Sequence, residues 1–249
     1  KLEAAGLDAA QMLIAQVTDP DSIKGCCEGV DVVLSTVGIT RQKDGLTYMD
    51  VDYQANRNLL DEALRAGVQK FIYISAFNGD RLRHLKICEA KERFVDDLKG
   101  SGMDYVVVRP NGFFSDMADF LEMAKRGRVY LFGDGKAKIN PLHGADLAEV
   151  CLDAIGSNDR EINVGGPEIF TQNQIAELAL KAWDKSPRIT HLPDWIRKVT
   201  LGAMRTFTSV KTYGPMEFFL TAMASDSVAP CHGVHRLEEF FEERVQAKG

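Results

Sequence analysis

Short runs of β-branched and aromatic residues alternate with amphipathic stretches through the first half of this sequence. The apolar runs occupy residues 12–17, 30–35, 71–75 and 105–109. Near-continuous apolar runs are typical of strands buried on both faces, as in a parallel sheet. Helical spacing of apolar residues recurs between them, over residues 21–29, 52–67 and 85–102. The alternation predicts a doubly wound parallel α/β fold, in which ligands bind beyond the carboxyl ends of the strands.

Glycine and proline divide the chain into two parts. Gly67 and Gly102 each follow a predicted helix and precede a new apolar run, as expected where a helix ends in a left-handed residue. After Arg109 the sequence becomes rich in Gly and Pro turns, with one clear helix over residues 174–183 that Thr171 is expected to cap. This change predicts a smaller lobe that follows the sheet domain.

Composition excludes several classes of protein. The 249 residues are 45% hydrophobic and 27% charged, as in ordinary globular domains. A net charge of -6 without a basic stripe argues against a nucleic-acid partner. The five cysteines have neither disulfide nor metal-ligand spacing, so we expect reduced thiols, no metal site and a cytoplasmic setting, with a plastid left open. No apolar run approaches the roughly 18 residues of a transmembrane helix, and no leader opens the chain.

Polar and small residues follow the predicted strands. Asp19 comes after the first strand, where it either faces a ligand or caps the next helix. Thr36, Val37 and Gly38 follow the second strand and form a small-residue turn that a flat ligand can approach closely, although a plain turn explains them equally well. Ser75 closes the third strand, either to bind a substrate oxygen or to cap its turn.

Lys91 lies in the predicted helix over residues 85–102, beside an apolar stripe that contains Ile87 and Phe94. Such a lysine is either desolvated and directed into a cleft or extended along the helix flank toward water.

In their order and spacing, these segments resemble the atypical short-chain dehydrogenase/reductases, in particular the NmrA-like branch with its divinyl reductase-like and isoflavone reductase-like proteins. The matching segments are residues 17–19, 31–38, 51–56, 58–60, 71–75, 105–110 and 143–148, with Lys91 eleven residues before Gly102. The resemblance covers nearly the whole chain. It implies a Rossmann-like fold that binds NADP, or NAD, and a small hydrophobic substrate.

The resemblance also implies roles for individual residues. Lys91 would hold the nicotinamide ribose and act with Ser75 in catalysis. The other cofactor-binding residues would be Asp19 near the adenine, Thr36, Val37 and Gly38 along the ribose and diphosphate, and Pro110, Asn111 and Phe113 beside the nicotinamide. The substrate would be contacted by Asn78, His84, Phe114 and His143.

Two departures from the family pattern bear on function. The glycine-rich turn that cradles the coenzyme diphosphate is missing, so we expect one β-α-β unit, roughly 35–40 residues, to be absent before Lys1. Residues 1–155 would then form an incomplete NAD(P)-binding domain, and residues 156–249, interwoven with residues 110–145, a substrate lobe.

The second departure is Ile87, which occupies the position of the catalytic tyrosine in a Tyr-x-x-x-Lys motif. A missing general acid disfavours simple ketone reduction. The leading hypothesis is a reductase centred on Lys91. The proton source would be either His84, which we expect two turns earlier on the same helix, or Ser75. The alternative is a non-catalytic coenzyme-binding sensor or assembly factor. The basic amphipathic stretch over residues 195–213 either lies on a membrane surface or packs on the core of the lobe.

Overall fold

The computed structural model describes residues 6, 8, 12–40 and 45–247, and its centre is a four-stranded parallel sheet. The strands, in their spatial order, are β1 (Val32–Ser35), β2 (Lys70–Ile74), β3 (Asp104–Pro110) and β6 (Glu161–Val164). β6 lies beyond residue 155, so the sheet takes its last strand from a segment that the sequence analysis assigned to the lobe. Alternating polar residues, Glu161 and Asn163, hide this strand from a search for apolar runs.

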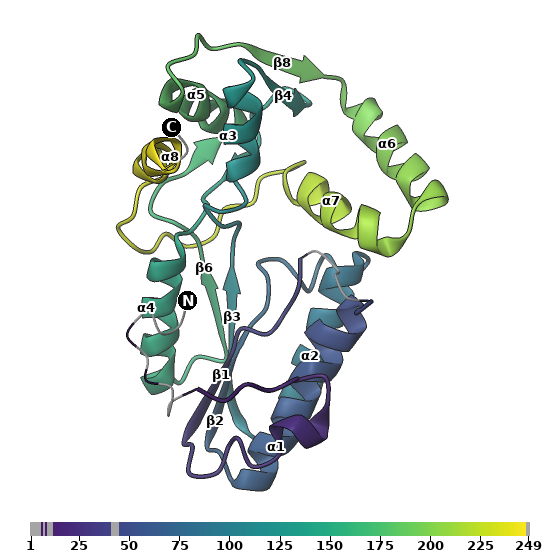
Figure 1. Ribbon diagram of the computed structural model, residues 1–249, viewed down its shortest axis with the longest axis vertical. Helices are drawn as coiled ribbons and strands as arrows, with labels where there is room; N and C mark the ends of the chain where they lie inside the picture. The colour runs from purple at the N-terminus through teal and green to yellow at the C-terminus, as the bar shows by residue number, and fades with distance from the viewer. Residues whose placement is uncertain (1–5, 7, 9–11, 41–44, 248–249) are drawn as a thin grey trace.

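Helices cover both faces of the sheet, which confirms the doubly wound α/β prediction. α1 (Asn56–Ala66) and α2 (Lys86–Gly100) lie on one face, and α4 (Gly144–Gly156) lies on the other (Figure 1). Phe71 and Tyr73 of β2 join the core beneath α1 and α2, while the alternate residue Ile72 joins the core beneath α4. Both sides of β2 are therefore buried, as its unbroken apolar sequence predicts.

Two helices end at the glycines that the sequence predicts. α1 ends at Gly67 in the left-handed region (φ 76°), and the same geometry at Gly102 (φ 79°) follows α2. A π-helical segment, η4 (Met49–Ala55), precedes α1 directly, so the predicted helix over residues 52–67 begins with one wider turn. Such π segments are frequent at functional sites because they redirect side chains.

The prediction of a strand over residues 12–17 is wrong. This segment has no ladder partner among the described residues, and Leu13 and Ile14 are 67% and 100% exposed. A strand needs a neighbour to satisfy its backbone groups, and here the segment is held instead by Asn58, whose Nδ2 donates to the Val17 carbonyl (3.0 Å). The helix predicted over residues 21–29 shrinks to one 3-10 turn, η3 (Pro20–Ile23).

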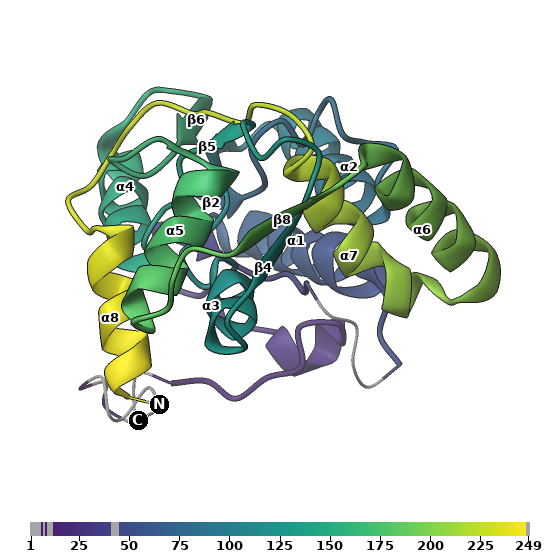
Figure 2. The same cartoon turned by 90° about the horizontal axis from the view of Figure 1, so that it is seen from above.

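The second part of the chain forms a lobe above the carboxyl edge of the sheet (Figures 1 and 2). Its strand pairs are β4 (Val129–Phe132) with β8 (Ile189–Leu192) and β5 (Lys138–Ile139) with β7 (Phe170–Thr171). Its helices are α3 (Ala118–Lys125), α5 (Gln172–Ala182), α6 (Asp194–Phe207), α7 (Val210–Ala222) and α8 (Leu237–Gln246). α5 is the predicted helix, and Thr171 and Gln174 form its capping box.

Glu62 of α1 stabilises the turn that follows η3. Its carboxylate accepts hydrogen bonds from Gly25 N (2.5 Å) and from the guanidinium of Arg65 (2.7 and 2.8 Å). The bonds from Arg65, joined by the one from Gly25, lower the pKa of Glu62 from 4.5 to about 2, although burial opposes the shift.

A depressed pKa makes this anchor sensitive to acid. Because the folded pKa lies below the unfolded value, Glu62 stabilises the fold above pH 4.5 and loses that contribution as the pH falls toward about 2. We expect Glu62→Gln to lose less stability than the wild type over this interval, measured by urea unfolding at a series of pH values. Glu89→Gln, at an exposed surface pair, is the control. Equal acid sensitivity of the wild type and Glu62→Gln would refute this role.

Candidate coenzyme site

Three predicted segments meet at one edge of the sheet because their strands are parallel and adjacent. Thr36, Val37 and Gly38 follow β1, Ser75 follows β2, and Pro110 ends β3. Backbone bonds continue beyond the strands, from Ser75 N to the Val108 carbonyl and from Phe77 N to the Pro110 carbonyl, both 2.9 Å. This edge is where an open α/β sheet binds its ligands.

Lys91 extends from α2 to this edge and forms an ion pair with a carboxylate that the sequence analysis did not single out. Its Nζ lies 2.9 Å from Oδ1 of Asp52, and the two side chains are 14% and 0% exposed. The other carboxylate oxygen of Asp52 accepts the Ile39 N–H at 3.3 Å. A lysine ammonium has three donor hydrogens, so a single partner does not exhaust its capacity.

Burial and charge act in opposite directions on this pair. Burial raises the pKa of Asp52 above its usual value, and the nearby Lys91 ammonium offsets only part of the shift. For Lys91, burial lowers the pKa, but the phenol of Tyr73 and the Asp52 carboxylate outweigh it, so the pKa stays above the usual lysine value. Lys91 is therefore a fixed cation at the edge of the sheet.

Gly38 is the position where the loop after β1 passes over this ion pair. A Cβ at residue 38 would lie 2.7 Å from Oδ1 of Asp52 and 2.9 Å from Nζ of Lys91. Contacts this short do not occur between such atoms, so only glycine lets the loop approach the pair. The structure thus brings together two predicted cofactor residues, Gly38 and Lys91.

A methyl group at Gly38 provides a direct check of this packing. We expect Gly38→Ala to destabilise the fold by about 1–3 kcal/mol, because the loop or the ion pair must move to make room. Gly202→Ala is the matched control: residue 202 lies in α6 with nothing within 4 Å of the position that an added methyl group would take, and alanine favours a helix by about 1 kcal/mol. Chemical denaturation that shows equal effects for both variants would contradict the close approach.

Asn56 holds the loop and the π-helical segment together, and the sequence analysis gave it no role. It is fully buried, and its Nδ2 donates to the carbonyls of Val37 (3.0 Å), Asp52 (3.1 Å) and Val51 (3.3 Å). Its Oδ1 accepts the hydroxyl of Ser35 at 2.5 Å. The sequence held one signal for this role of Asn56. It is a polar residue in the first turn of a helix, four positions after the buried Asp52.

Tyr73 is the aromatic residue beside Lys91. Nζ of Lys91 lies 5.6 Å from the centre of the Tyr73 ring, and the phenol donates to the Asp52 carbonyl at 3.4 Å. Burial raises the pKa of Tyr73 to about 12. Because Tyr73 is 0% exposed, it cannot touch a substrate and does not replace the acid missing at Ile87, which is itself buried.

Ser75 belongs to a buried network beneath the site. Its hydroxyl donates to Oε1 of Glu92 at 2.6 Å, and Arg109 binds both carboxylate oxygens of Glu92, at 2.5 and 2.9 Å. These three residues are all less than 5% exposed. Glu92 is the neighbour of Lys91 on α2, so the network fixes the helix that carries the lysine to the ends of β2 and β3. A catalytic role for Ser75 stays a prediction, and it requires this hydroxyl to leave Glu92.

Asn111 joins the sheet domain to the lobe. Its Nδ2 donates to Asn140 Oδ1 (2.8 Å) and to the Ser227 carbonyl (2.6 Å), and its Oδ1 accepts the Gly112 N–H at 3.0 Å. Pro110 is buried and Phe113 half-buried at the same junction. Asn111 therefore lies at the predicted edge of the sheet, and its side-chain amide forms hydrogen bonds that connect the sheet domain to the lobe.

The remaining predicted residues lie in turns. Asp19 is exposed and accepts the Asp21 N–H at 3.1 Å, so the capping role is confirmed. Asn78 adopts the left-handed region (φ 56°) in the turn after β2. The expectation that His84 shares a helix face with Lys91 is wrong, because α2 begins only at Lys86, after the extended residue Leu85. His84 is an exposed turn residue.

Phe114 and His143 meet the C-terminal segment. Phe114 is 3% exposed and packs against His143 and Phe240, with ring centres 5.6 and 5.5 Å apart. His143 caps α4 and stacks on His235 at 4.2 Å, and His235 in turn binds the buried Asp146 at 2.6 Å. Packing therefore engages both predicted substrate residues, and their contact with a substrate stays a prediction.

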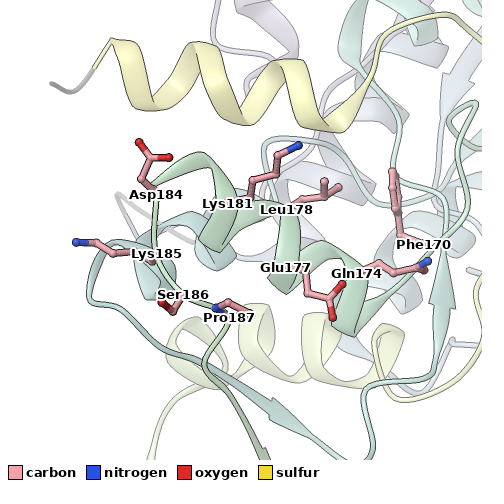
Figure 3. Close-up of a pocket in the computed structure, with 9 residues that line it drawn as sticks. All are labelled: Phe170, Gln174, Glu177, Leu178, Lys181, Asp184, Lys185, Ser186 and Pro187. Atoms are coloured by element: carbon pink, nitrogen blue, oxygen red, sulfur yellow. The ribbon is translucent and has the colours of Figure 1, made fainter.

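A surface hollow of about 780 Å³ lies along α5 and the loop that follows it, away from these residues. Figure 3 shows that its side chains come from α5, from Phe170 of β7 before it and from the loop after it. Lys181 is paired with Glu238 of α8 at 2.6 Å. No convergent set of polar groups marks it as a site. Within the residues that the structure describes, no three metal-ligating side chains cluster, and no helix is long and apolar enough to cross a bilayer.

The site fits one end of a dinucleotide. Lys91, the exposed Thr36 and Gly38, and the strand ends offer a cation and an open backbone for a ribose. The glycine pairs do not offer a diphosphate cradle here, because Gly133 and Gly135 line a pocket in the lobe and Gly165 and Gly166 pack against residues 140–142. The described residues thus offer no cradle for the diphosphate, and contact of Lys91 with the nicotinamide ribose stays a prediction.

Solved structures share the fold of this chain. A nucleoside-diphosphate-sugar epimerase from Staphylococcus aureus matches with a TM-score of 0.68 at 15% identity, over 92% of this chain and 82% of the epimerase. An NADPH-dependent quinone oxidoreductase from Escherichia coli, complexed with NADPH, matches with a TM-score of 0.66 at 17% identity, over 99% and 87% of the two chains. Both likenesses establish a Rossmann-like fold.

The family model described as NAD(P)H-binding matches residues 1–158. The chain belongs to this NAD(P)H-binding family and is an atypical short-chain dehydrogenase/reductase. The chloroplastic divinyl chlorophyllide a 8-vinyl-reductase of Arabidopsis thaliana is 27% identical over 96% of this chain. Photosystem II assembly factor Ycf39 of Trieres chinensis is 21% identical over 76% of it. The chain spans 65% of the length of the first relative and 60% of the second.

Proposed function

We propose that the protein is an NAD(P)H-dependent reductase of a small hydrophobic substrate, with the coenzyme ribose held by Lys91 at the carboxyl edge of the sheet. The observation that carries this proposal is the ion pair of Lys91 with the buried Asp52 directly beneath Gly38. Asp52 orients the ammonium and takes one donor, which leaves others for ribose hydroxyls. NADP is the favoured coenzyme, in keeping with the NADPH-bound quinone oxidoreductase of the same fold.

The site suits reduction of an activated double bond or a quinone. A reduced nicotinamide supplies a hydride. Lys91 then stabilises negative charge that develops on a substrate oxygen or conjugated system, which is the electrostatic role of an oxyanion site. Ile87 has no ionisable group and Tyr73 is buried, so neither delivers a proton to the substrate. The proton comes from water or an exposed side chain.

Two parts of the chain have separate roles in this proposal. Residues 1–155, together with β6, bind coenzyme, and the rest of residues 156–249, with residues 110–145, surround the substrate. We propose that a further strand and helix complete the first part. β1 is the edge of the described sheet, and Leu34, which faces the same side as α4, is 45% exposed. Leu152 and Ile155 of α4 are 63% and 46% exposed. A β-α-β unit beside β1 would cover these residues, and its glycine-rich turn would supply the amides for the diphosphate.

Coenzyme oxidation tests the reductase proposal. NADPH absorbance is followed with divinyl chlorophyllide a and with a benzoquinone as substrates, for the wild type and Lys91→Met. We expect turnover of at least one substrate and a loss of about 10²–10³-fold in kcat/KM in the variant. Lys86→Met, at an exposed pair on the first turn of α2, is the control and retains activity. Turnover that does not depend on Lys91 would contradict the proposal.

The second candidate is a coenzyme-binding sensor or assembly factor without turnover. The buried Ile87 at the tyrosine position favours it, and two of the similar proteins are photosystem II assembly factors by name. Saturable NADPH binding with no oxidation of either substrate would favour this candidate over the reductase.

A peripheral membrane contact is a further prediction, because α6 has an apolar outer face. Trp195, Val199 and Phe207 are 63%, 60% and 84% exposed, and Lys198 and Lys211 are exposed nearby. We expect the protein to float with vesicles of anionic lipid and Trp195→Ser/Phe207→Ser to float less, since exposed aromatic and basic groups favour the interface. Equal flotation of both proteins would refute the contact. The chloroplastic relatives favour a plastid over the cytoplasm as its location.

A further inference from the structure

Two adjacent cysteines lie in the turn that follows η3, away from the predicted coenzyme residues. The Sγ atoms of Cys26 and Cys27 are 3.6 Å apart, within reach of a weak hydrogen bond between the two thiols. Consecutive side chains on an extended strand point to opposite faces and do not meet in this way. The contact between the sulfur atoms therefore depends on the local turn.

The fold holds this turn in place from both sides. Gly25 and Gly29 flank the two cysteines and adopt the left-handed region (φ 84° and 75°), which lets the chain change direction sharply. The N–H of Gly25 donates to the Glu62 carboxylate of α1 at 2.5 Å. In Figure 1 this segment, drawn in dark purple, lies beside α1. The two thiols are thus kept together by contacts with the rest of the domain.

The two thiols have different environments. Cys26 is partly exposed, whereas Cys27 is 2% exposed and packs in the core with Leu60 and Ala63 of α1. Burial raises the pKa of the Cys27 thiol to about 12, and the hydrogen bond with Cys26 adds to the shift. Because a reagent in solution reaches only the exposed sulfur atom, Cys26 is the thiol that reacts first.

We propose that Cys26 and Cys27 form a reversible disulfide by exchange with low-molecular-weight disulfides. The Cys26 thiolate attacks one sulfur atom of the small disulfide and expels the other half as a thiolate. Cys27 then loses its proton to solvent, and its sulfur atom attacks that of Cys26 and expels the second half. The two cysteines lose two electrons and two protons, and the small disulfide gains them as two thiols.

The position of Cys27 compensates for its weak acidity in the second step. The reaction is intramolecular and starts from sulfur atoms that are already in contact, so the effective concentration of the attacking group is high. Burial still disfavours the Cys27 thiolate. The Cys26 thiol also raises the pKa of Cys27, through its hydrogen bond and its charge, and this effect is lost once Cys26 carries a mixed disulfide.

A disulfide between adjacent residues is easily reduced. Neighbouring Cα atoms are about 3.8 Å apart across a trans peptide bond, whereas disulfides usually join Cα atoms about 4.4–6.8 Å apart. Strained disulfides of this kind are the labile ones. The pair therefore responds to the thiol and disulfide balance around the protein. The inference goes beyond the reductase proposal, because the exchange needs neither coenzyme nor Lys91.

Oxidised glutathione, added to the folded chain, tests the proposal. Acid stops the reaction, free thiols are alkylated in urea, and the peptides are identified by mass spectrometry. We expect the peptide that contains Cys26 and Cys27 to lose two hydrogen atoms and to escape alkylation, and an excess of reduced glutathione to restore both thiols. The exposed Cys231 is the internal control and should carry a glutathionyl group. An unreacted pair, or oxidation of the pair only in urea, overturns the proposal.

Variants separate the two steps. In Cys27→Ser, we expect the glutathionyl group on Cys26 to be at least about tenfold more abundant than in the wild type, where the adjacent thiol displaces it. Cys27→Ala gives the same readout if the serine variant fails to fold. In Cys26→Ser, the buried Cys27 should stay unmodified, and Cys231→Ser should oxidise the pair as the wild type does. Equal abundance of the Cys26 adduct in the wild type and the Cys27 variants overturns the proposal.

Discussion

Lys91→Met is expected to destabilise the fold by about 3–5 kcal/mol, because it leaves the buried Asp52 carboxylate without its counterion. The double variant Lys91→Met/Asp52→Asn removes both charges and should recover most of this loss. Urea unfolding of the two single variants and the double variant gives the coupling energy of the pair. Recovery of stability without recovery of turnover or coenzyme binding would show that Lys91 contributes to function directly. A double variant no more stable than Lys91→Met would contradict the pairing.

The same variant should acquire a distinctive pH dependence. Burial already raises the pKa of Asp52, and the loss of the Lys91 ammonium, which lowers it, raises it further. A carboxyl whose folded pKa exceeds its unfolded pKa binds more protons in the folded state, so stability falls as the pH rises through that interval. Lys91→Met should therefore be more stable in mild acid than at neutral pH, relative to the wild type. The Asp52→Asn change should abolish this difference.

Asn56→Ala is expected to cost about 2–4 kcal/mol, the second large effect. The substitution removes the donor to two buried carbonyl groups, those of Val51 and Asp52, and to the half-buried carbonyl of Val37. It also removes the acceptor of the Ser35 hydroxyl. Buried polar groups without partners cost about 1–3 kcal/mol each, and partial relaxation lowers the sum. NADPH affinity should also fall, since the Val37 carbonyl anchors the loop that precedes Gly38.

Asn58→Ala is the matched control on the same helix. Asn58 is nearly buried but donates to one carbonyl, that of Val17, and accepts one bond from Gln54. We expect a loss of about 1 kcal/mol and unchanged coenzyme affinity. Equal losses in the two variants, measured by urea unfolding, would show that Asn56 has no special role in the loop.

The sheet and its helices could be predicted from the sequence where local signals agree with the tertiary environment. β2 and β3 are unbroken apolar runs because both of their faces are covered, whereas Leu34 leaves one face of β1 partly exposed. Gly67 and Gly102 mark helix ends through backbone geometry alone. The segment over residues 12–17 has the same local signal but no neighbouring strand among the described residues. Pairing between strands depends on residues far apart in the sequence, so the apolar run alone wrongly predicts a strand over residues 12–17.

The site was predicted in part for a similar reason. Gly38 and Lys91 could be found from motif spacing, since Gly38 follows a predicted strand and Lys91 lies within a predicted helix. Asp52 and Asn56 contribute through contacts across about 40 and 20 residues of sequence, with Lys91 and Ser35 respectively. Their partners become visible only when the helices pack on the sheet. From the sequence, the hydroxyl of Ser75 could bind a substrate oxygen. In the fold, it donates a hydrogen bond to Glu92 instead.

The central claim is that Lys91 at the carboxyl edge of the sheet binds the coenzyme. The most direct measurement is a fluorescence titration of NADPH into the longest chain that the reading frame encodes, compared with its Lys91→Met/Asp52→Asn variant, whose charge-neutral pair should keep the fold intact. We predict saturable binding by the wild type and at least about tenfold weaker binding by the folded variant, which corresponds to about 1.4 kcal/mol. Equal affinity in the two proteins, or no binding by either, would contradict the claim.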